Sequence, residues 1–187
     1  MPVDDGTQTL LLNPDKLFLI GPMGAGKTAI GKELARQLKH DFLDADQEIE
    51  RRTGADVALI FEKEGEPGFR RREREIIAEL TQRDNLVLAT GGGAVLDPVN
   101  REALQSRGFV IYLRASVDSQ ASRTAQNRNR PLLHTEDRET RLQQLFEARR
   151  PFYESLARLT VDTDSGQVKQ ITQRIISELE RQEAASR

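Results

Sequence analysis

The feature that most constrains this chain is a glycine-rich loop after a short apolar run. The run is Leu17-Phe18-Leu19-Ile20, and the loop is Gly21-Pro22-Met23-Gly24-Ala25-Gly26-Lys27-Thr28. The loop fits G-x-x-x-x-G-K-[ST] at every fixed position, a pattern in which backbone N–H groups and the positive end of the following helix bind nucleotide phosphates. The sequence therefore predicts an α/β fold that binds a nucleoside triphosphate. The expected phosphate-binding residues are Gly24, Ala25, Gly26, Lys27, Thr28 and Ala29.

Two side chains of the loop have separate tasks in this interpretation. Lys27 reaches the β- and γ-phosphates, and Thr28 supplies a hydroxyl for Mg²⁺. An ordinary glycine turn between a strand and a helix is the alternative. The residues after the loop argue against it, because apolar residues recur at the spacing of one helix face and Gly31 would let that helix pack closely on a sheet.

The composition indicates one soluble globular domain. The chain has 187 residues and combines 37% hydrophobic with 31% charged residues, as a single folded domain does. Its formal net charge of −2 provides no overall positive field for nucleic acid or an anionic membrane. Because the chain has no cysteine, disulfides, thiolate zinc sites and cysteine nucleophiles are excluded.

Both ends of the chain are expected to lie outside the domain. Residues 1–15 are polar and lack the basic region and apolar core of a signal peptide, and residues 182–187 offer little apolar surface. No apolar run approaches membrane-spanning length. We therefore predict a flexible leader at 1–15, a single domain at 16–181, a short tail at 182–187 and a cytoplasmic location.

Short β-type runs alternate with longer helical patterns, which favours a parallel sheet with crossover helices. The runs are 17–20, 41–43, 86–90, 109–115 and 159–163. The third and fourth runs are almost continuously apolar, as expected for central strands covered on both faces. Asp97 and Pro98 are expected to begin a helix, and Gly108 is expected to end it in the left-handed conformation.

Distinctive residues follow the predicted strands at the end where open parallel sheets bind ligands. Asp44 and Asp46 come after the second run, and Gly91-Gly92-Gly93 after the third. Beside a phosphate loop, paired carboxylates can address a metal and an attacking hydroxyl, although aspartate is also common at helix N-caps. Three successive glycines suggest that a substrate approaches the backbone closely; a tight strand-to-helix turn is the alternative.

Three arginine positions are candidates for binding anions. Arg70 lies near the start of a charged amphipathic helix, where it could offer its guanidinium to a carboxylate. Arg130 lies in a polar stretch that could close over the site or could be a solvated linker. One of the pair Arg149 and Arg150 could point back toward the cleft.

Six sequence blocks, in one order, resemble the shikimate kinase family from about residue 16 to residue 180. They are G-P-M-G-A-G-K-T, D-A-D, F-E-K-E-G-E-P-G-F-R-R-R-E, A-T-G-G-G, R-P-L-L and A-R-R-P-F-Y. The resemblance implies a three-layer P-loop fold like that of the nucleoside monophosphate kinases. This fold has a five-stranded parallel sheet of order 2-3-1-4-5, a substrate-binding segment after the second strand and a lid near residues 126–138. Thr28 stands where serine is common in this family, which preserves the hydroxyl.

The resemblance also implies a reaction, namely transfer of the γ-phosphoryl group of ATP to the 3-hydroxyl of shikimate in chorismate and aromatic amino-acid biosynthesis. Asp46 would hydrogen-bond the ring hydroxyls and orient or deprotonate the attacking one. Arg70 and Arg149 would clamp the substrate carboxylate. The glycine triplet would approach the substrate by its backbone, and its members are Gly91, Gly92 and Gly93.

The nucleotide side of the site follows from the same resemblance. Lys27 and Arg130 would act catalytically on the ATP phosphates, and Arg130 would arrive with the lid. Thr28 and Asp44 would hold Mg²⁺, with Asp44 acting through water. The implied partners are two small molecules, ATP and shikimate, with no nucleic acid or membrane, and the implied assembly is a monomer.

Two other functions remain open. A kinase of gluconate or of a nucleoside monophosphate could share this fold. A nucleotide acceptor would call for a base-binding pocket, and between residues 45 and 75 only Phe61 and Phe69 offer aromatic surface. A nucleotide-dependent switch or binding module would not need two arginines and an acid that converge on a small anion.

Overall fold

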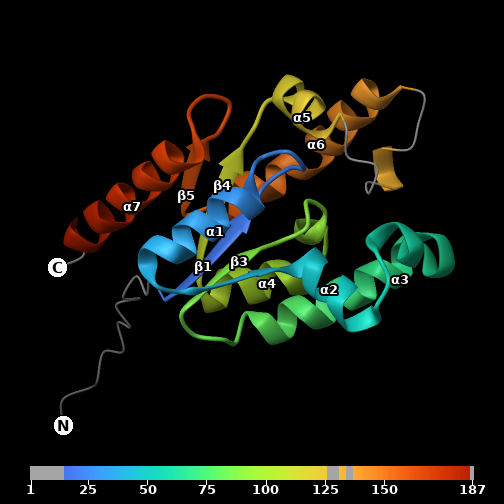
Figure 1. The fold of residues 1–187 in the computed structure, drawn as a ribbon, viewed down its shortest axis with the longest axis horizontal. Helices are drawn as coiled ribbons and strands as arrows, with labels where there is room; N and C mark the ends of the chain where they lie inside the picture. The colour runs from blue at the N-terminus through green and yellow to red at the C-terminus, as the bar shows by residue number, and fades with distance from the viewer. Residues whose placement is uncertain (1–14, 126–130, 134–136, 186–187) are drawn as a thin grey trace, which may run out of the picture.

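The computed structural model describes residues 15–125, 131–133 and 137–185, and Figure 1 shows one sheet with helices on both faces. The sheet is parallel throughout and has the strand order β2-β3-β1-β4-β5, so the predicted order is confirmed. The strands are β1 (Lys16–Ile20), β2 (Asp41–Asp44), β3 (Leu86–Ala89), β4 (Phe109–Arg114) and β5 (Leu159–Asp162). The α-helices are α1 (Lys27–Leu38), α2 (Ala45–Thr53), α3 (Val57–Leu80), α4 (Pro98–Arg107), α5 (Val117–Thr124), α6 (Arg138–Leu156) and α7 (Val168–Ala185). Two short 3₁₀ turns complete the described elements, namely η1 (Ala94–Leu96) and η2 (Pro131–Leu133).

The central strand β1 divides the core into two layers. Successive side chains of a strand point to opposite faces of the sheet. Leu17 and Leu19 accordingly pack in the layer beneath α1 and α7, whereas Phe18 and Ile20 pack in the layer that holds α2, α3 and α4. All four side chains are fully buried, which explains why this strand is a continuous apolar run.

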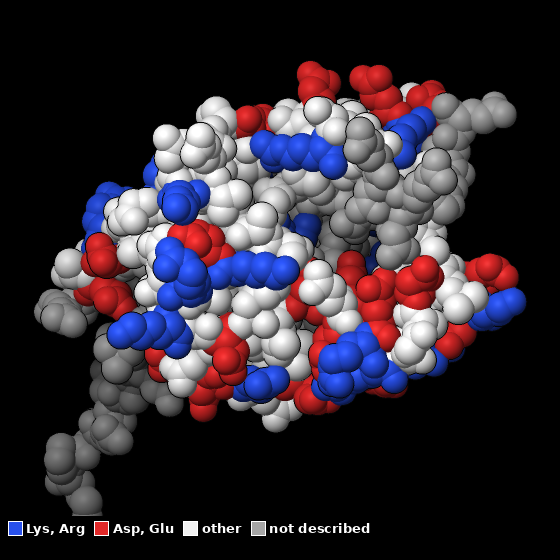
Figure 2. All heavy atoms as spheres, viewed as in Figure 1, with Lys and Arg blue, Asp and Glu red and all other residues white. Residues whose placement is uncertain are grey.

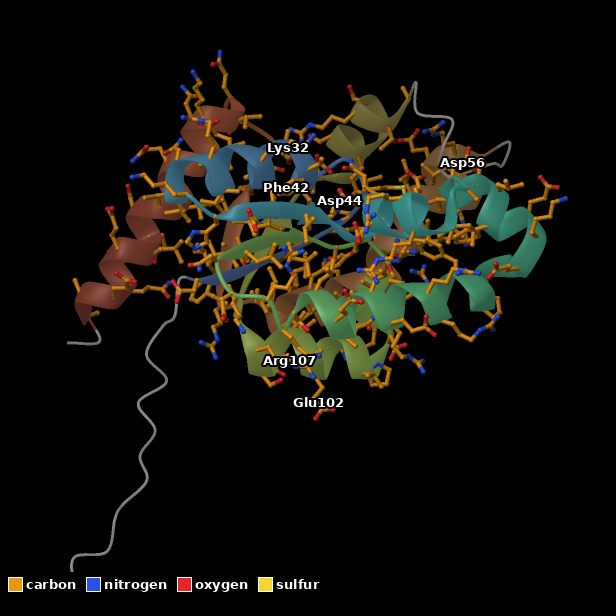
Figure 3. The ribbon with its side chains drawn as sticks, turned by 60° about the horizontal axis from the view of Figure 1, so that its bottom comes forward. Lys32, Phe42, Asp44, Asp56, Glu102 and Arg107 are labelled. Carbon is orange, nitrogen blue, oxygen red and sulfur yellow. The ribbon has the colours of Figure 1, made fainter. Side chains whose placement is uncertain are left out.

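Close packing brings α1 onto the sheet, as predicted from Gly31. A Cβ atom at this position would lie 2.5 Å from the Phe42 ring and 3.0 Å from Leu19 Cδ1. The next residue, Lys32, places its ammonium group 6.0 Å from the centre of the Phe42 ring, and Figure 3 shows the two side by side. Because α1 begins at the glycine-rich loop, this packing also fixes the position of that loop relative to the sheet.

The helix α3 has a break that sets the position of Arg70. Gly65 has φ of 69° and ψ of 178°, which is not helical, and Pro67 follows it. Proline is favoured in the first turn of a helix, where its missing N–H group is not needed. The helix therefore restarts there, and Arg70 lies in the first turns of the second segment, as predicted.

One helix end differs from expectation. The helix α4 begins as predicted, because the Asp97 side chain accepts a hydrogen bond from the N–H of Val99 and Pro98 is its first residue. The prediction that Gly108 is left-handed is wrong, since its φ of −163° is extended. Glycine is needed there for space, because a Cβ atom would lie 2.5 Å from the ring of Phe18.

The ends of the described chain differ slightly from the predicted boundaries. The carbonyl of Asp15 accepts a hydrogen bond from the N–H of Leu86, so pairing with β3 reaches one residue into the predicted leader. The helix α7 continues to Ala185, past the domain end expected at residue 181. Within the described residues, no helix is both long and apolar enough to cross a membrane.

Candidate active site

The glycine-rich loop leaves the N-terminal end of α1 open to a ligand. Gly24 and Gly26 have φ of 78° and 88°, a left-handed conformation that glycine adopts without strain. Gly26 caps α1 without a side-chain hydrogen bond, so the backbone N–H groups of the first turn face the loop. Lys27 Nζ lies 2.7 Å from the carbonyl oxygens of both Gly21 and Pro22. The loop thus has the form of an anion-binding site, and the Lys27 ammonium group lies against its backbone.

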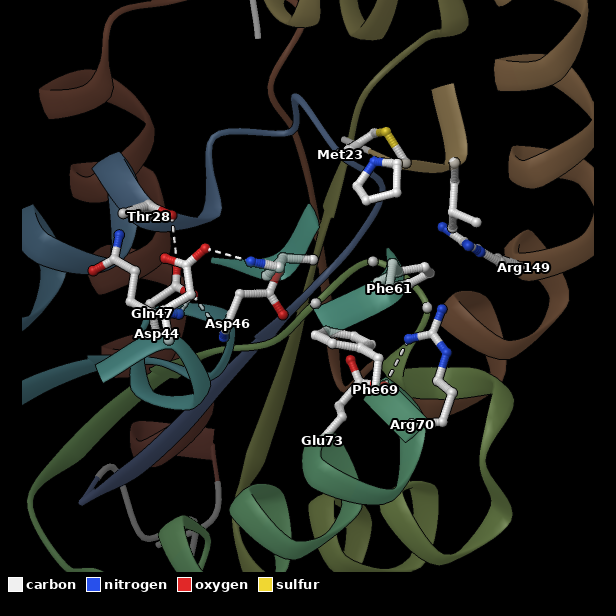
Figure 4. A pocket seen from close by; sticks show the side chains of 17 residues that line it. Met23, Thr28, Asp44, Asp46, Gln47, Phe61, Phe69, Arg70, Glu73 and Arg149 are labelled. Carbon is white, nitrogen blue, oxygen red and sulfur yellow. Dashed lines mark hydrogen bonds and ion pairs between the residues drawn. The ribbon is translucent and has the colours of Figure 1, made fainter. Parts of the chain in front are cut away.

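Thr28 and Asp44 meet at the junction of the loop and β2. The Thr28 hydroxyl donates to Asp44 Oδ2 at 2.7 Å, as Figure 4 shows. The other oxygen, Asp44 Oδ1, accepts from the N–H groups of Asp46 at 3.0 Å and Gln47 at 3.3 Å and caps α2. The N-cap alternative therefore holds for Asp44, but one carboxylate oxygen still points at the threonine hydroxyl.

The oxygens of Thr28 and Asp44 fit a Mg²⁺ ion that arrives with a nucleotide. Mg²⁺ prefers oxygen ligands and, beside nucleotide phosphates, keeps several waters and takes few ligands from the protein. In the described part of the chain, no group of three His, Asp or Glu side chains is arranged to enclose a metal ion. A hydroxyl and a carboxylate 2.7 Å apart beside the loop are the donor set that a nucleotide-bound ion requires.

The glycine triplet begins two residues after the end of β3 and is crowded by charged side chains. A Cβ atom at Gly91 would lie 2.6 Å from Glu73 Oε1 and 2.9 Å from Asp46 Oδ1. At Gly93 it would lie 2.2 Å from Arg70 Nη2. None of the three glycines has a positive φ, so at Gly91 and Gly93 it is space rather than backbone conformation that favours glycine. The close approach inferred from the sequence is thus made, at these two positions, by side chains of the site itself.

Arg70 is held by two carboxylates on its own helix. Its Nη1 lies 2.7 Å from Glu73 Oε2, and its Nη2 lies 3.0 Å from Glu66 Oε1. Burial raises the pKa of Glu73, which is fully buried, and the Arg70 charge opposes that rise. Burial would lower the pKa of Arg70, but the two glutamates outweigh it and raise the pKa. The guanidinium is therefore a fixed cation at the edge of the pocket.

Arg149 of α6 is the second cation of the pocket. It is only 3% exposed, whereas its neighbour Arg150 points into solvent. Burial lowers the pKa of Arg149, and the nearby Tyr153 hydroxyl opposes that effect. No ion pair joins Arg149 to a carboxylate among the described residues. A buried cation of this kind is ready to accept an anionic ligand.

A single pocket of about 260 Å³ joins these groups, and Figure 4 shows Arg70 and Arg149 on one side and Asp46 near Thr28 on the other. On the face shown in Figure 2, acidic and basic side chains are interspersed and the surface is hollowed near its middle. The pocket also has an apolar wall. Its apolar lining residues include Met23, Val57, Phe61, Phe69, Pro131 and Leu132. The pocket thus suits a small molecule with an apolar ring face, hydroxyls and one negative charge.

Some predicted residues of the site lie outside the described residues, and some residues of the site were not predicted. Arg130 and most of the expected lid lie outside the described residues, although Pro131 and Leu132 line the pocket. Glu73 was not predicted, although it lies three residues after Arg70, a spacing at which helical side chains pair. Tyr153, four residues after Arg149, was missed in the same way.

The fold and the pocket define a class of enzyme. A phosphate loop with a threonine–aspartate pair, facing a pocket with the Asp46 carboxylate and two guanidinium groups, is the arrangement of an ATP-dependent kinase that phosphorylates a small molecule. A family profile described as shikimate kinase matches residues 23–180. The chain belongs to the shikimate kinase family.

Individual relatives agree with the family assignment. The chain is 55% identical over 163 residues to a shikimate kinase of Legionella pneumophila strain Corby, covering 87% of this chain and 93% of that protein. A solved structure of shikimate kinase from Acinetobacter baumannii in complex with shikimate matches with a TM-score of 0.89 and 46% identity, covering 93% of this chain and 98% of the other. A gluconokinase structure from Sinorhizobium meliloti, with a TM-score of 0.59, 17% identity and coverage of 92% and 95%, shares the fold alone.

Proposed function

We propose that this pocket carries out the reaction of its family, transferring the γ-phosphoryl group of ATP to the 3-hydroxyl of shikimate. The products are shikimate 3-phosphate and ADP. The observation that carries the proposal is the placement of Arg70, Arg149 and Asp46 around one pocket beside the phosphate loop. Phosphoryl transfer depends mainly on alignment and charge stabilisation, which these groups can provide.

The two arginines would bind the shikimate carboxylate. Arg70 is fixed by Glu73 and Glu66, and Arg149 is buried without an ion pair to any carboxylate that the structure describes. An incoming carboxylate would supply the partner that Arg149 lacks and would form charge-assisted hydrogen bonds with both guanidinium groups. The apolar wall at Phe61 and Phe69 would contact the ring of the substrate.

Asp46 would act on the attacking hydroxyl. Its carboxylate lies in the first turn of α2, beside the Gly91 backbone, and it lines the pocket. Its oxygens would accept hydrogen bonds from the ring hydroxyls and take the proton of the 3-hydroxyl as the new P–O bond forms. The bond from the γ-phosphorus to the leaving ADP oxygen breaks in the same transfer.

The loop would hold ATP at the other side of the pocket. Residues Gly24 to Ala29 would bind its phosphates, and Lys27 would exchange its two backbone acceptors for phosphate oxygens. Thr28 and Asp44 would hold Mg²⁺, Asp44 through water. When bound, the ion offsets the negative charge of the phosphates.

Other parts of the proposal come from the family resemblance. Arg130 would reach the phosphates from a lid near residues 126–138. The enzyme would work as a monomer in the cytoplasm, with ATP and shikimate as its partners and neither nucleic acid nor membrane. The rival function is phosphorylation of gluconate or a nucleoside monophosphate on the same fold.

Release of ADP, measured by a coupled assay with shikimate, gluconate and AMP as separate acceptors, tests the proposal. We expect turnover with shikimate and only background with the other two. Turnover with gluconate or AMP alone would contradict the proposed function. Equal ATP consumption with and without shikimate would favour a nucleotide-dependent switch.

A further inference from the structure

Tyr153 of α6 is buried beside Arg149 and beneath the glycine triplet that lines the pocket. It follows Arg149 by four residues, so the two side chains share one face of the helix. The ring is fully buried and stacks on Tyr112 of β4, with 5.1 Å between the ring centres. Burial raises the pKa of Tyr153, so its hydroxyl keeps its proton and can donate it.

The Tyr153 hydroxyl connects α6 to the glycine triplet. It donates to the carbonyl oxygen of Gly92 at 2.5 Å, and Arg149 Nη1 lies beside the same glycine, 3.4 Å from where a Cβ atom would stand. The other two carbonyls of the triplet are used within its own turn, since Gly91 accepts from the N–H of Ala94 and Gly93 accepts from that of Leu96. The middle carbonyl is thus held by a side chain that lies 61 residues away in the sequence.

We propose that Tyr153 is a positioning residue for substrate binding, whose hydroxyl holds the Arg149 guanidinium and the Gly92 backbone in one arrangement. This inference rests on the proposed function, in which Arg149 binds the shikimate carboxylate. Arg149 has no ion pair with a described carboxylate, and the nearby Tyr153 hydroxyl opposes the lowering of its pKa by burial, so loss of the phenol oxygen removes a polar group that favours the buried charge. The same change leaves the Gly92 carbonyl without the donor from α6.

Phenylalanine replacements of the two stacked tyrosines make a matched pair. Tyr153→Phe removes the connecting hydroxyl, whereas Tyr112→Phe removes a buried hydroxyl that has no hydrogen-bond partner in the described structure. For Tyr153→Phe we expect about a tenfold higher KM for shikimate, with kcat and the KM for ATP within about twofold of wild type. Tyr112→Phe should match wild type. A KM for shikimate that is equal in the two variants would overturn the proposal.

A second measurement does not depend on the stability of Tyr153→Phe. The chain contains two tyrosines, so 3-fluorotyrosine incorporated into Tyr112→Phe reports on Tyr153 alone. We expect its ¹⁹F resonance to shift when shikimate is added and to stay in place when ADP is added. A resonance unmoved by saturating shikimate would contradict the positioning role. Absence of shikimate turnover by the wild type would instead reject the proposed function, which separates the two failures.

Discussion

Arg70 and Arg149 line the same pocket, but within the described structure only Arg70 is paired with a carboxylate, at 2.7 Å from Glu73. Glu73 is itself fully buried, so the two charges of this pair depend on one another. Arg149, at 3% exposed, is a buried cation without an ion pair to a described carboxylate. Both guanidinium groups therefore favour binding of an anion. Without a ligand, however, Arg70 stabilises the fold through its pair with Glu73, whereas the buried charge of Arg149 lowers the stability.

Replacing each arginine by methionine should separate its contribution to substrate binding from its contribution to stability. Arg70→Met and Arg149→Met should each raise the KM for shikimate about 10- to 100-fold, because each removes charge-assisted hydrogen bonds. Arg70→Met should also lower the free energy of unfolding by about 3 kcal/mol, since it leaves Glu73 buried without its partner. Arg149→Met should keep or raise that free energy. Urea denaturation measures the free energy of unfolding of each variant. Adding Glu73→Gln to Arg70→Met should restore stability, because the unpaired charge is removed. Equal stability losses in Arg70→Met and Arg149→Met would contradict this account.

Removal of the phosphate-loop cation should affect chemistry more than folding. We expect Lys27→Ala to lower kcat about 10²- to 10³-fold, the usual cost of losing one group that stabilises transition-state charge. Steady-state ADP release measures this loss. Lys32→Ala, which changes an exposed lysine of the same helix, is the control and should keep wild-type kcat. A comparable kcat in both variants would remove Lys27 from the reaction.

The outer glycines of the triplet should have different kinetic roles. An added methyl at Gly93 would meet the flexible end of Arg70, so Gly93→Ala should fold and raise the KM for shikimate about tenfold. An added methyl at Gly91 would meet the carboxylates of Glu73 and Asp46, so Gly91→Ala should also lower kcat. Initial-rate kinetics with varied shikimate distinguish the two effects. Identical changes in kcat and KM at both positions would show that the triplet responds as a general packing site.

A pH-dependent group of ion pairs should stabilise α2. Hydrogen bonds from Arg51 and Arg52 lower the pKa of Glu48 to about 2, from an ordinary value of 4.5, against the opposing effect of burial. A carboxylate with a lowered pKa stabilises the fold above pH 4.5 and loses this contribution as the pH falls toward 2.

Glu48→Gln should therefore lower the free energy of unfolding by about 0.5 to 1 kcal/mol at pH 7, and by progressively less below pH 4.5. Denaturation at a series of pH values measures the difference. Glu75→Gln, at an exposed position of α3, is the control. A difference between Glu48→Gln and wild type that stays constant down to pH 2 would contradict the assigned cause.

The sequence could predict the features that depend on local patterns, but not those that depend on long-range contacts. The phosphate loop and the acids at the end of β2 are contiguous signals, so Lys27, Thr28 and Asp44 could be placed from the sequence. The burial of Glu73 beneath the glycine triplet could not, because it depends on how the second segment of α3 packs against the loop after β3. The reach of Tyr153 to Gly92 likewise joins residues 61 positions apart. Neither contact leaves a local pattern in the sequence.

The central claim is that two guanidinium groups grip the carboxylate of a small acceptor alcohol beside the nucleotide. The most direct test compares kcat/KM for shikimate with that for its primary carboxamide, which keeps the ring hydroxyls and loses the negative charge. We expect the carboxamide to be phosphorylated with a kcat/KM about a hundredfold lower, because charge-assisted hydrogen bonds to Arg70 and Arg149 are lost. Equal values of kcat/KM for the two acceptors would contradict the account.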